Sequence, residues 1–252
     1  MKSLFNEKPL LTVMVQTPEA DAAIDTIRKA IPSGAEAFGL QTCRLKPEYC
    51  NEDTYRRIFA ETRERPVYVT NYRYGYNTET GDDVLAEGLL TLARSGASLV
   101  DVMGDLYDRH PEELTTDPVA VDKQKKLIDQ IHDAGAQVLM SSHVYHFIPA
   151  ERVLEMALTQ QERGVDVVKI VTGADSMEQQ IENLKITNML KQELKVPFLF
   201  LSAGQSRLHR LVGPALGSCM YLCVYEHDEL STKAQPLLAH AKAVRDNIII
   251  EG

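Results

Sequence analysis

Short β-rich runs recur along the chain, and a glycine or proline junction leads into nearly all of them. The junctions start at Gly34, Arg65, Gly96, Gly135, Gly164, Val196 and Gly217, and residues 10–16 supply an eighth run. Glycine commonly ends helices, so these junctions indicate changes from helix to strand. Amphipathic stretches lie between the runs, as in residues 119–134, where Leu127, Ile128 and Ile131 fall on one helical face. Strand and helix therefore alternate along the chain.

This alternation predicts a parallel sheet whose strands are joined by right-handed crossovers, either as a closed barrel or as an open doubly wound sheet. Eight such units in 252 residues favour the barrel. An open nucleotide-binding sheet is disfavoured because no Gly-rich phosphate loop opens a helix, and residues 172–175 contain a single glycine. We therefore predict an α/β protein, a (β/α)8 TIM barrel that forms a single domain over residues 1–252.

The charge of the chain excludes some classes of partner. Its 27 Lys+Arg against 36 Asp+Glu give a net charge of -9, which disfavours binding to phosphate backbones or anionic lipid. No apolar run reaches membrane-spanning length, and residues 1–9 lack the apolar stretch of a signal peptide. We expect a cytoplasmic protein with no nucleic-acid or membrane partner.

The four cysteines are too few for a disulfide framework and are expected to be buried thiols. Cys219 and Cys223 have the spacing of a metal-binding pair, but no matching Cys/His pair follows them. The alternation of residues 219–223 is typical of a strand. We predict that the protein binds no metal.

Two residues at strand ends carry the most chemical information. Catalytic side chains of a (β/α)8 barrel lie at the carboxyl ends of its strands. The run 136–143 ends in His143, and Lys169 interrupts the apolar run 165–171. An unpaired buried amine favours its neutral form, which can attack a ketone to give an imine, and a nearby histidine can then remove a proton from the adjacent carbon. The alternatives are an ion pair between Lys169 and Asp101, and a core position for His143.

These residues and their surroundings resemble the motifs of the type I 3-dehydroquinate dehydratases. Ser142-His143 is similar to the family's Ser-Tyr-His motif, and residues 164–170 are similar to its Gly-Ala-Asp-x-x-Lys-Ile motif. The family's members are (β/α)8-barrel lyases of the shikimate or quinate route and are commonly homodimers. The resemblance, which spans most of the chain, implies a carbon–oxygen lyase without a cofactor. Lys169 would form a Schiff base with a small keto acid, and His143 would be the acid/base.

The resemblance also implies a set of substrate contacts. Residues 206–213 are similar to the stretch whose arginine holds the substrate carboxylate, which places Arg210 in that role. Ser231 and Gln235 are similar to the serine and glutamine of the family's lid. Arg73 lies one residue from the place of an arginine on the third strand, and Gln41 takes the place of the arginine in a Glu-x-Arg pair on the second strand.

Several family positions are altered. Gly39 stands where the family has the glutamate of that pair, and Met103 stands where it has a second acidic residue. The glutamate that orients the histidine has no evident counterpart, and Asn77, near its place, would not stabilise an imidazolium as a carboxylate does. The histidine is therefore expected to be a weaker base. Loss of groups that bind hydroxyls changes substrate preference.

Three hypotheses follow from these matches and departures. The first is dehydration of 3-dehydroquinate or a related cyclic keto acid through Lys169. The second is an aldolase-type Schiff-base lyase that acts on a different keto acid. The third is a barrel that binds a metabolite without catalysis.

Overall fold

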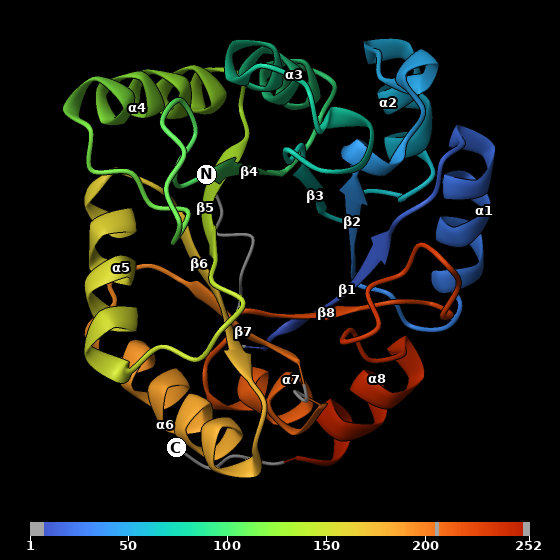
Figure 1. Ribbon diagram of the computed structural model, residues 1–252. Coiled ribbons are helices and arrows are strands. Elements are labelled where there is room, and N and C mark those ends of the chain that lie inside the picture. Colours follow the sequence, from blue (N-terminus) through green and yellow to red (C-terminus); the bar gives the residue numbers. More distant parts are fainter. Residues whose placement is uncertain (1–7, 205–206, 249–252) are drawn as a thin grey trace.

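The computed structural model describes residues 8–204 and 207–248, which build one (β/α)8 barrel (Figure 1). The eight strands are β1 (Leu10–Val15), β2 (Ala37–Gln41), β3 (Val67–Thr70), β4 (Leu99–Met103), β5 (Gln137–His143), β6 (Val167–Ala174), β7 (Phe198–Gly204) and β8 (Met220–Cys223). Each begins within a run that the sequence indicates or a few residues after its junction. The predicted fold class is confirmed.

The helices form an outer ring around the strands, as Figure 1 shows. They are α1 (Ala20–Ala30), α2 (Glu52–Ala60), α3 (Asp82–Arg94), α4 (Pro118–Asp133), α5 (Ala150–Glu162), α6 (Met177–Glu193), α7 (Arg207–Val212) and α8 (Leu238–Asn247). Short 3-10 helices η1 (Thr42–Arg44), η2 (Pro47–Tyr49), η3 (Gly75–Asn77) and η4 (Gly213–Leu216) lie in the connections. Gly96 and Gly135, after α3 and α4, have φ angles of 103° and 89°, a left-handed backbone that favours glycine.

All strand pairs are parallel, in the order β7-β6-β5-β4-β3-β2-β1-β8. The ring is completed between β7 and β8 by hydrogen bonds at the start of the two strands. The Cys219 amide donates to the Phe198 carbonyl at 2.8 Å, and the Phe200 amide donates to the Ser218 hydroxyl at 3.0 Å. A side chain thus replaces one rung of the ladder where the barrel closes.

Two apolar layers surround the strands. The larger one lies between the barrel and the helices, and a smaller one fills the inside of the barrel, with Met14, Leu99, Leu139, Val167 and Leu199 among its members. Residues of a strand alternate between these layers. Ser141 on β5 is paired with Lys169 on β6, and His143 lies two residues farther along β5. The side chains of all three therefore face the inside of the barrel, near its carboxyl-terminal end.

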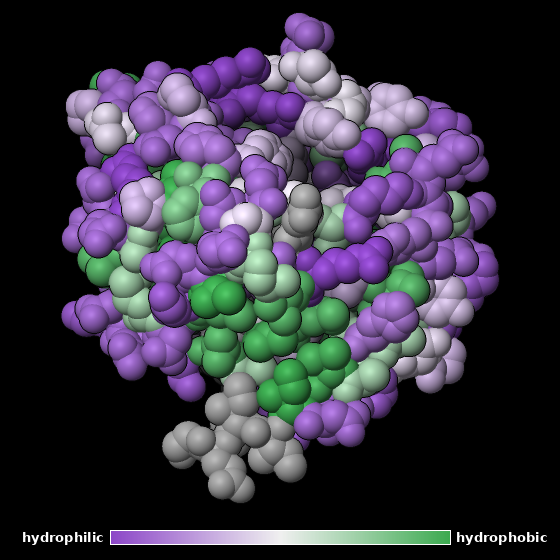
Figure 2. Space-filling view, turned by 60° about the horizontal axis from the view of Figure 1, so that its bottom comes forward, coloured by the Kyte–Doolittle hydropathy of each residue, from purple (hydrophilic) through white to green (hydrophobic). Residues whose placement is uncertain are grey.

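The surface view shows a hollow in the barrel and a group of apolar residues below it, on the side formed by α6, α7 and α8 (Figure 2). Exposed apolar side chains on α6 and α7 include Met177, Ile181 and Leu208. Within residues 8–204 and 207–248, no helix combines the length and apolar character needed to cross a membrane.

Candidate active site

A cavity of about 410 Å³ lies at the carboxyl ends of the strands, where (β/α)8 barrels hold their active sites. Six of the seven predicted site residues line it: Gln41, Arg73, His143, Lys169, Arg210 and Gln235. The seventh, Ser231, is not part of the lining. The topology therefore collects side chains from most of the chain at one place.

Lys169 enters the cavity from the inside of β6 and is paired with Asp101 from β4. The Lys169 side chain is 4% exposed and its Nζ lies 3.1 Å from Asp101 Oδ2, while Ser141 Oγ donates to the other carboxylate oxygen at 2.5 Å. The ion pair that the sequence left open is thus present. Because Lys169 also lines the cavity, the pair and a role in chemistry are compatible.

Two tyrosines that were not among the predicted site residues complete the surroundings of the amine. Lys169 Nζ donates to the hydroxyl of Tyr68 at 2.9 Å and to that of Tyr72 at 2.5 Å. Both hydroxyls donate in turn to Asp101 Oδ2. The ring of Tyr72 also meets the ring of His143 edge-on, with 5.1 Å between centroids. Tyr72 therefore lies between the amine and the histidine.

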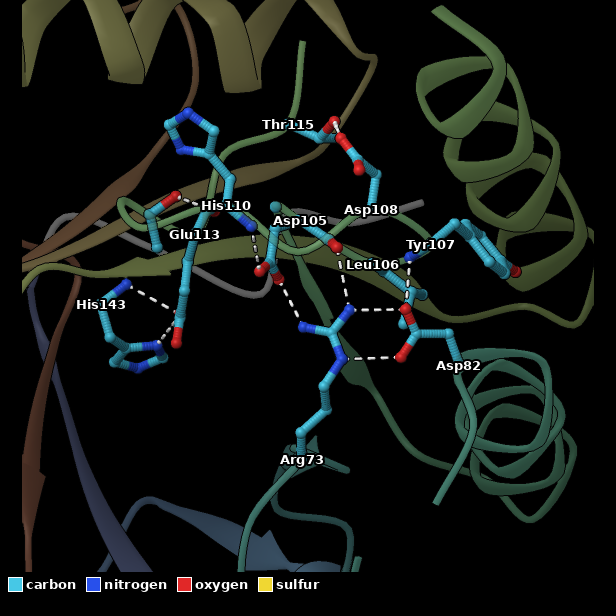
Figure 3. Close-up of polar contacts among 12 residues, drawn as sticks. Arg73, Asp82, Asp105, Leu106, Tyr107, Asp108, His110, Glu113, Thr115 and His143 are labelled. Atoms are coloured by element: carbon cyan, nitrogen blue, oxygen red, sulfur yellow. Dashed lines mark hydrogen bonds and ion pairs between the residues drawn. The ribbon is translucent and has the colours of Figure 1, made fainter. Parts of the chain in front are cut away.

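His143, at the end of β5, is held by a carboxylate from a different part of the chain than expected. Its Nδ1 lies 2.7 Å from Glu113 Oε2, and its backbone amide donates to the same oxygen at 2.9 Å (Figure 3). Asn77, which lies near the place of the family's glutamate in the sequence, donates instead to Asn71 Oδ1 and to the Tyr72 carbonyl. The expectation that the histidine lacks a carboxylate partner is wrong, because Glu113 occupies that place.

The ionisation of Glu113 follows from this contact. Burial by itself raises the pKa of Glu113, but the hydrogen bonds and charge of His143, together with the charge of Lys169, outweigh burial and lower the pKa below its ordinary value of 4.5. The carboxylate is therefore negative at neutral pH. It can fix the orientation of the imidazole and stabilise the imidazolium that forms when Nε2 takes a proton.

Glu113 belongs to the β4–α4 loop (residues 104–117), which is held by a buried arginine. Arg163 Nη1 donates to Gln124 Oε1 at 2.6 Å, and its Nη2 donates to the Thr115 carbonyl at 2.5 Å. Glu113 itself has a φ angle of 47°, a conformation that is uncommon outside glycine. Contacts from α4 and from the end of α5 thus fix a loop whose own sequence carries no regular pattern.

Arg73 holds the start of the same loop through Asp105, as Figure 3 shows. Its guanidinium makes a two-pronged contact with Asp82 at 2.6 Å and bonds Asp105 Oδ1 at 2.7 Å. Asp82 also accepts from the Tyr107 amide at 2.8 Å. Arg73 reaches the cavity wall, but two carboxylates occupy its donors, so its predicted role as a substrate contact stays a prediction.

Arg210, on α7, differs from Arg73 because no carboxylate of the described residues lies within ion-pair distance of it. Its Nε donates to the Ser202 carbonyl at 2.6 Å, and the side chain is buried and faces the cavity. Burial lowers the pKa of Arg210 to about 10, so the guanidinium remains charged at neutral pH. A buried cation without a counter-charge favours an anionic ligand.

The loop before α8 contributes Gln235 and Thr232 to the cavity wall. Thr232 Oγ1 accepts from Gln16 Nε2 at 3.1 Å, which ties the loop to the end of β1. Ser231 is turned away from the cavity, and its hydroxyl exchanges hydrogen bonds with the backbone of Asp228 at 3.0 Å. Its predicted contact with substrate therefore requires the turn to open and stays a prediction.

The ends of β1 and β2 contribute two amide side chains to the wall. Gln16 Nε2 donates to Gln41 Oε1 at 2.6 Å, so the two amides bind each other. A side-chain carbon added at Gly39 would collide with the sulfur of Met14. The space that a side chain at position 39 would need is therefore filled by Met14, which explains how the chain accommodates the loss of an acidic residue there.

No group of three or more His, Cys, Asp and Glu side chains in residues 8–204 and 207–248 is arranged to hold a metal ion. The four cysteines are free thiols.

A family model described as Type I 3-dehydroquinase matches residues 11–246. The chain belongs to the type I 3-dehydroquinase family. This confirms the resemblance drawn from the motifs around His143 and Lys169.

Curated relatives share about a third of the aligned residues with this chain. A 3-dehydroquinate dehydratase from Listeria monocytogenes is 30% identical over 173 residues, a match that covers 67% of this chain and 62% of the relative. A protein of the same name from Klebsiella pneumoniae is 32% identical over 149 residues, which covers 58% of this chain and 55% of the relative. The matches thus span less than two thirds of the length of these relatives.

Solved structures resemble this chain over nearly its full length. The 3-dehydroquinate dehydratase of Geobacillus kaustophilus has a TM-score of 0.81 at 15% identity, with 96% of this chain and 91% of that chain covered. The type I enzyme of Clostridium difficile, with covalently modified comenic acid, has a TM-score of 0.80 at 15% identity, with 96% and 92% covered. At these identities the likeness supports the fold alone.

Proposed function

We propose that this protein is a lyase that dehydrates 3-dehydroquinate, or a closely related cyclic keto acid, through a Schiff base at Lys169. One observation carries the proposal. A single cavity collects a buried lysine, a histidine held by a carboxylate, and the buried cation of Arg210. Imine formation, proton abstraction and carboxylate binding each need one of these groups.

The chemistry follows from their placement. The Lys169 amine forms an imine with the ketone of the substrate, and the protonated imine makes the neighbouring carbon acidic. His143 takes a proton from that carbon, and the resulting imidazolium is stabilised by Glu113. The same proton then leaves with the β-hydroxyl as water, which forms the double bond. Hydrolysis of the imine releases an unsaturated keto acid and restores the lysine.

Arg210 supplies the orientation that this sequence of steps requires. A guanidinium can hold a carboxylate with two parallel hydrogen bonds, which fixes both the position and the rotation of the ring. The carbon that loses its proton is then held close to His143, and such positioning contributes as much to rate as the strength of the base. The Gln235 side chain lies in the same wall and can bind the carboxylate as well.

A keto acid with a different pattern of hydroxyl groups is the second candidate substrate for the same Schiff-base chemistry. The amides of Gln16 and Gln41 bind each other in a part of the wall without a charged pair, and Met14 fills the space beside Gly39. A pocket built to bind hydroxyls rejects substrate analogues that lack them. A pocket without those binding groups no longer favours the hydroxylated substrate. An aldolase-type cleavage of another keto acid would use the same lysine.

Borohydride trapping tests the proposal directly. The protein is incubated with 3-dehydroquinate and sodium borohydride, and its intact mass is compared with that of the Lys169→Ala variant. We expect a mass increase by one reduced substrate or product molecule in the wild type and none in the variant. In a parallel assay, the ultraviolet absorbance of an enone acid should grow in the wild type alone.

The outcomes separate the hypotheses. An adduct without enone absorbance, together with release of an aldehyde or small keto fragment, would favour the aldolase-type reaction. No adduct with 3-dehydroquinate but one with another cyclic keto acid would reassign the substrate. No adduct with any member of a keto-acid panel would leave a metabolite-binding barrel as the better description.

Two further features belong to this proposal. The resemblance to the family supports assembly as a homodimer, which light scattering on a size-exclusion column can test at several protein concentrations. The free thiols of the four cysteines fit a reducing compartment and hence a cytoplasmic enzyme, which fractionation of the native cells can test.

A further inference from the structure

The amine of Lys169 is connected to Asp101 by two tyrosine hydroxyls as well as directly. Nζ donates to Tyr72 at 2.5 Å and to Tyr68 at 2.9 Å, closer than its 3.1 Å to Asp101 Oδ2. Each hydroxyl donates onward to that same carboxylate oxygen. Each tyrosine therefore forms a chain of two hydrogen bonds along which a proton can pass from nitrogen to carboxylate.

The two tyrosines differ in what else they contact. Tyr68 belongs to β3, is 3% exposed and packs within the apolar layer inside the barrel. Tyr72 follows the strand and places its ring edge against His143, with 5.1 Å between centroids. A ketone attached to Lys169 must also lie within reach of His143, which removes a proton from the neighbouring carbon. Of the two hydroxyls, that of Tyr72 is therefore next to the carbon that the amine attacks.

We propose that Tyr72 is a catalytic residue that relays protons between Lys169, Asp101 and the bound ketone while the imine forms and breaks. This inference rests on the Schiff-base chemistry of the proposed function. A relay is needed because an ammonium paired with a carboxylate has no free electron pair for attack, and because the oxygen of the ketone must leave as water.

The relay balances at each step. The ammonium of Lys169 gives a proton to the oxygen of Tyr72 as the hydroxyl proton of Tyr72 passes to Asp101, which leaves a neutral amine, a neutral phenol and a carboxylic acid. The amine forms the nitrogen–carbon bond, and the carbonyl oxygen takes a proton from the nitrogen. Asp101 then returns its proton through Tyr72 to that hydroxyl, the carbon–oxygen bond breaks, and water leaves with formation of the protonated imine.

The environment favours such a relay over a free phenolate. Burial, followed by the negative charge of Asp101, raises the pKa of Tyr72 well above its ordinary value of 10. The hydroxyl therefore gives up its own proton as it receives another. The same reasoning applies to Tyr68, whose pKa is also raised by burial and by Asp101, but the ring that meets His143 is that of Tyr72.

The test uses acetylacetone as a probe of imine formation that does not depend on the natural substrate. This diketone condenses with a reactive lysine through the same carbinolamine and gives a stable, ultraviolet-absorbing enaminone. We expect Tyr72→Phe to slow enaminone formation roughly 100-fold, as is usual for loss of a general acid/base, with an unchanged final amount of adduct. Tyr68→Phe, which removes a hydroxyl bonded to the same two groups, should slow it less than about tenfold.

The final amount of adduct distinguishes a loss of catalysis from a displacement of Lys169. A catalyst changes the forward and reverse rates together, whereas a displaced lysine would lower the final amount of adduct at a given diketone concentration. Equal rates in wild type and Tyr72→Phe would overturn the inference, as would equal losses in the two tyrosine variants, a lowered final amount, or a wild type whose Lys169 does not react. Reaction with acetylacetone but not with 3-dehydroquinate would overturn the proposed substrate and leave the relay supported.

Discussion

Glu113 determines how strong a base His143 can be. Its carboxylate bonds Nδ1 of the imidazole and the backbone amide of the same residue, so the ring is fixed with Nε2 free for a proton. A histidine held in this way is both oriented and stabilised in its charged form. The lowered pKa of Glu113 keeps the carboxylate charged across the neutral range.

Replacing this carboxylate with an amide should therefore impair catalysis. We expect Glu113→Gln to lower kcat for dehydration by about 100-fold to 1000-fold, because the amide keeps the size of the side chain but not its charge, as in other histidine–carboxylate pairs. Glu112→Gln is the matched control, because the carboxylate of Glu112 bonds Arg152 rather than His143. Steady-state kinetics gives kcat for both variants. Equal kcat values for Glu113→Gln and Glu112→Gln would contradict a role of Glu113 in the mechanism.

Substitution of Arg210 should weaken substrate binding. Arg210→Lys keeps a positive charge but cannot reproduce the two parallel hydrogen bonds of a guanidinium. We expect KM to rise about tenfold or more, with a smaller loss in kcat. Arg207→Lys, on the same helix but exposed, should leave both constants near those of the wild type. An unchanged KM in Arg210→Lys would show that the substrate carboxylate is bound elsewhere.

The sequence predicted two of the three central groups of the site. Lys169 lies within β6 and His143 ends β5, and a polar residue in the apolar run of a regular strand is easy to recognise. Glu113 lies in an irregular loop, in a left-handed conformation, and reaches His143 only because long-range contacts fold that loop. The contacts of Tyr68 and Tyr72 could not be predicted either, because no local pattern shows that their hydroxyls meet Asp101.

The β4–α4 loop is the element on which the position of Glu113 depends, and Arg73 connects it to α3. The bonds from Arg73 to Asp82 and Asp105 join the start of α3 to the start of the loop (Figure 3). Buried ion pairs of this kind are costly to break one partner at a time, because the remaining charge is left without a counterpart. Arg73 is thus suited to positioning Glu113, whether or not it also meets substrate.

Substitution of either partner should distinguish positioning from substrate binding. We expect Arg73→Gln to lower kcat at least tenfold and to lower the thermal midpoint by several degrees. Asp82→Asn should reproduce both effects, although Asp82 is not part of the cavity lining, and Arg73→Lys should restore part of the rate. Should Arg73→Gln raise KM alone while Asp82→Asn behaves as the wild type, Arg73 would be a substrate contact.

The elements of the barrel were more accessible to prediction than its loops. Each strand except β1 begins a few residues after one of the glycine or proline junctions, because the end of a helix is a local event that glycine marks. The hydrogen bonds that close the predicted barrel between β7 and β8 were not visible in the sequence, since one of them uses the hydroxyl of Ser218 in place of a backbone group. Local patterns show where strands and helices lie, whereas contacts between distant segments determine how the loops fold and which site residues meet.

The stability of the folded chain should depend on pH through His209, which is completely buried between α6, α7 and β7. Its Nε2 lies 3.0 Å from Thr187 Oγ1, whose own proton goes to the Asn183 carbonyl, so Nε2 carries the hydrogen. Among the described residues, Nδ1 has no partner. Burial first, and the charge of Arg210 second, lower the pKa of His209 to about 3.

Acid should therefore destabilise the protein well above the pKa values of its carboxyl groups. In the unfolded chain a histidine binds a proton near pH 6.5, whereas His209 in the folded chain resists it down to about pH 3. The stabilising contribution is complete above pH 6.5 and is lost progressively between these values, at about 1.4 kcal/mol per pH unit. Urea unfolding from pH 8 to pH 5 should show a loss of about 2 kcal/mol that His209→Gln largely removes. His240→Gln, at an exposed position of α8, should keep the slope of the wild type, and parallel slopes for all three proteins would mean that other groups set the acid sensitivity.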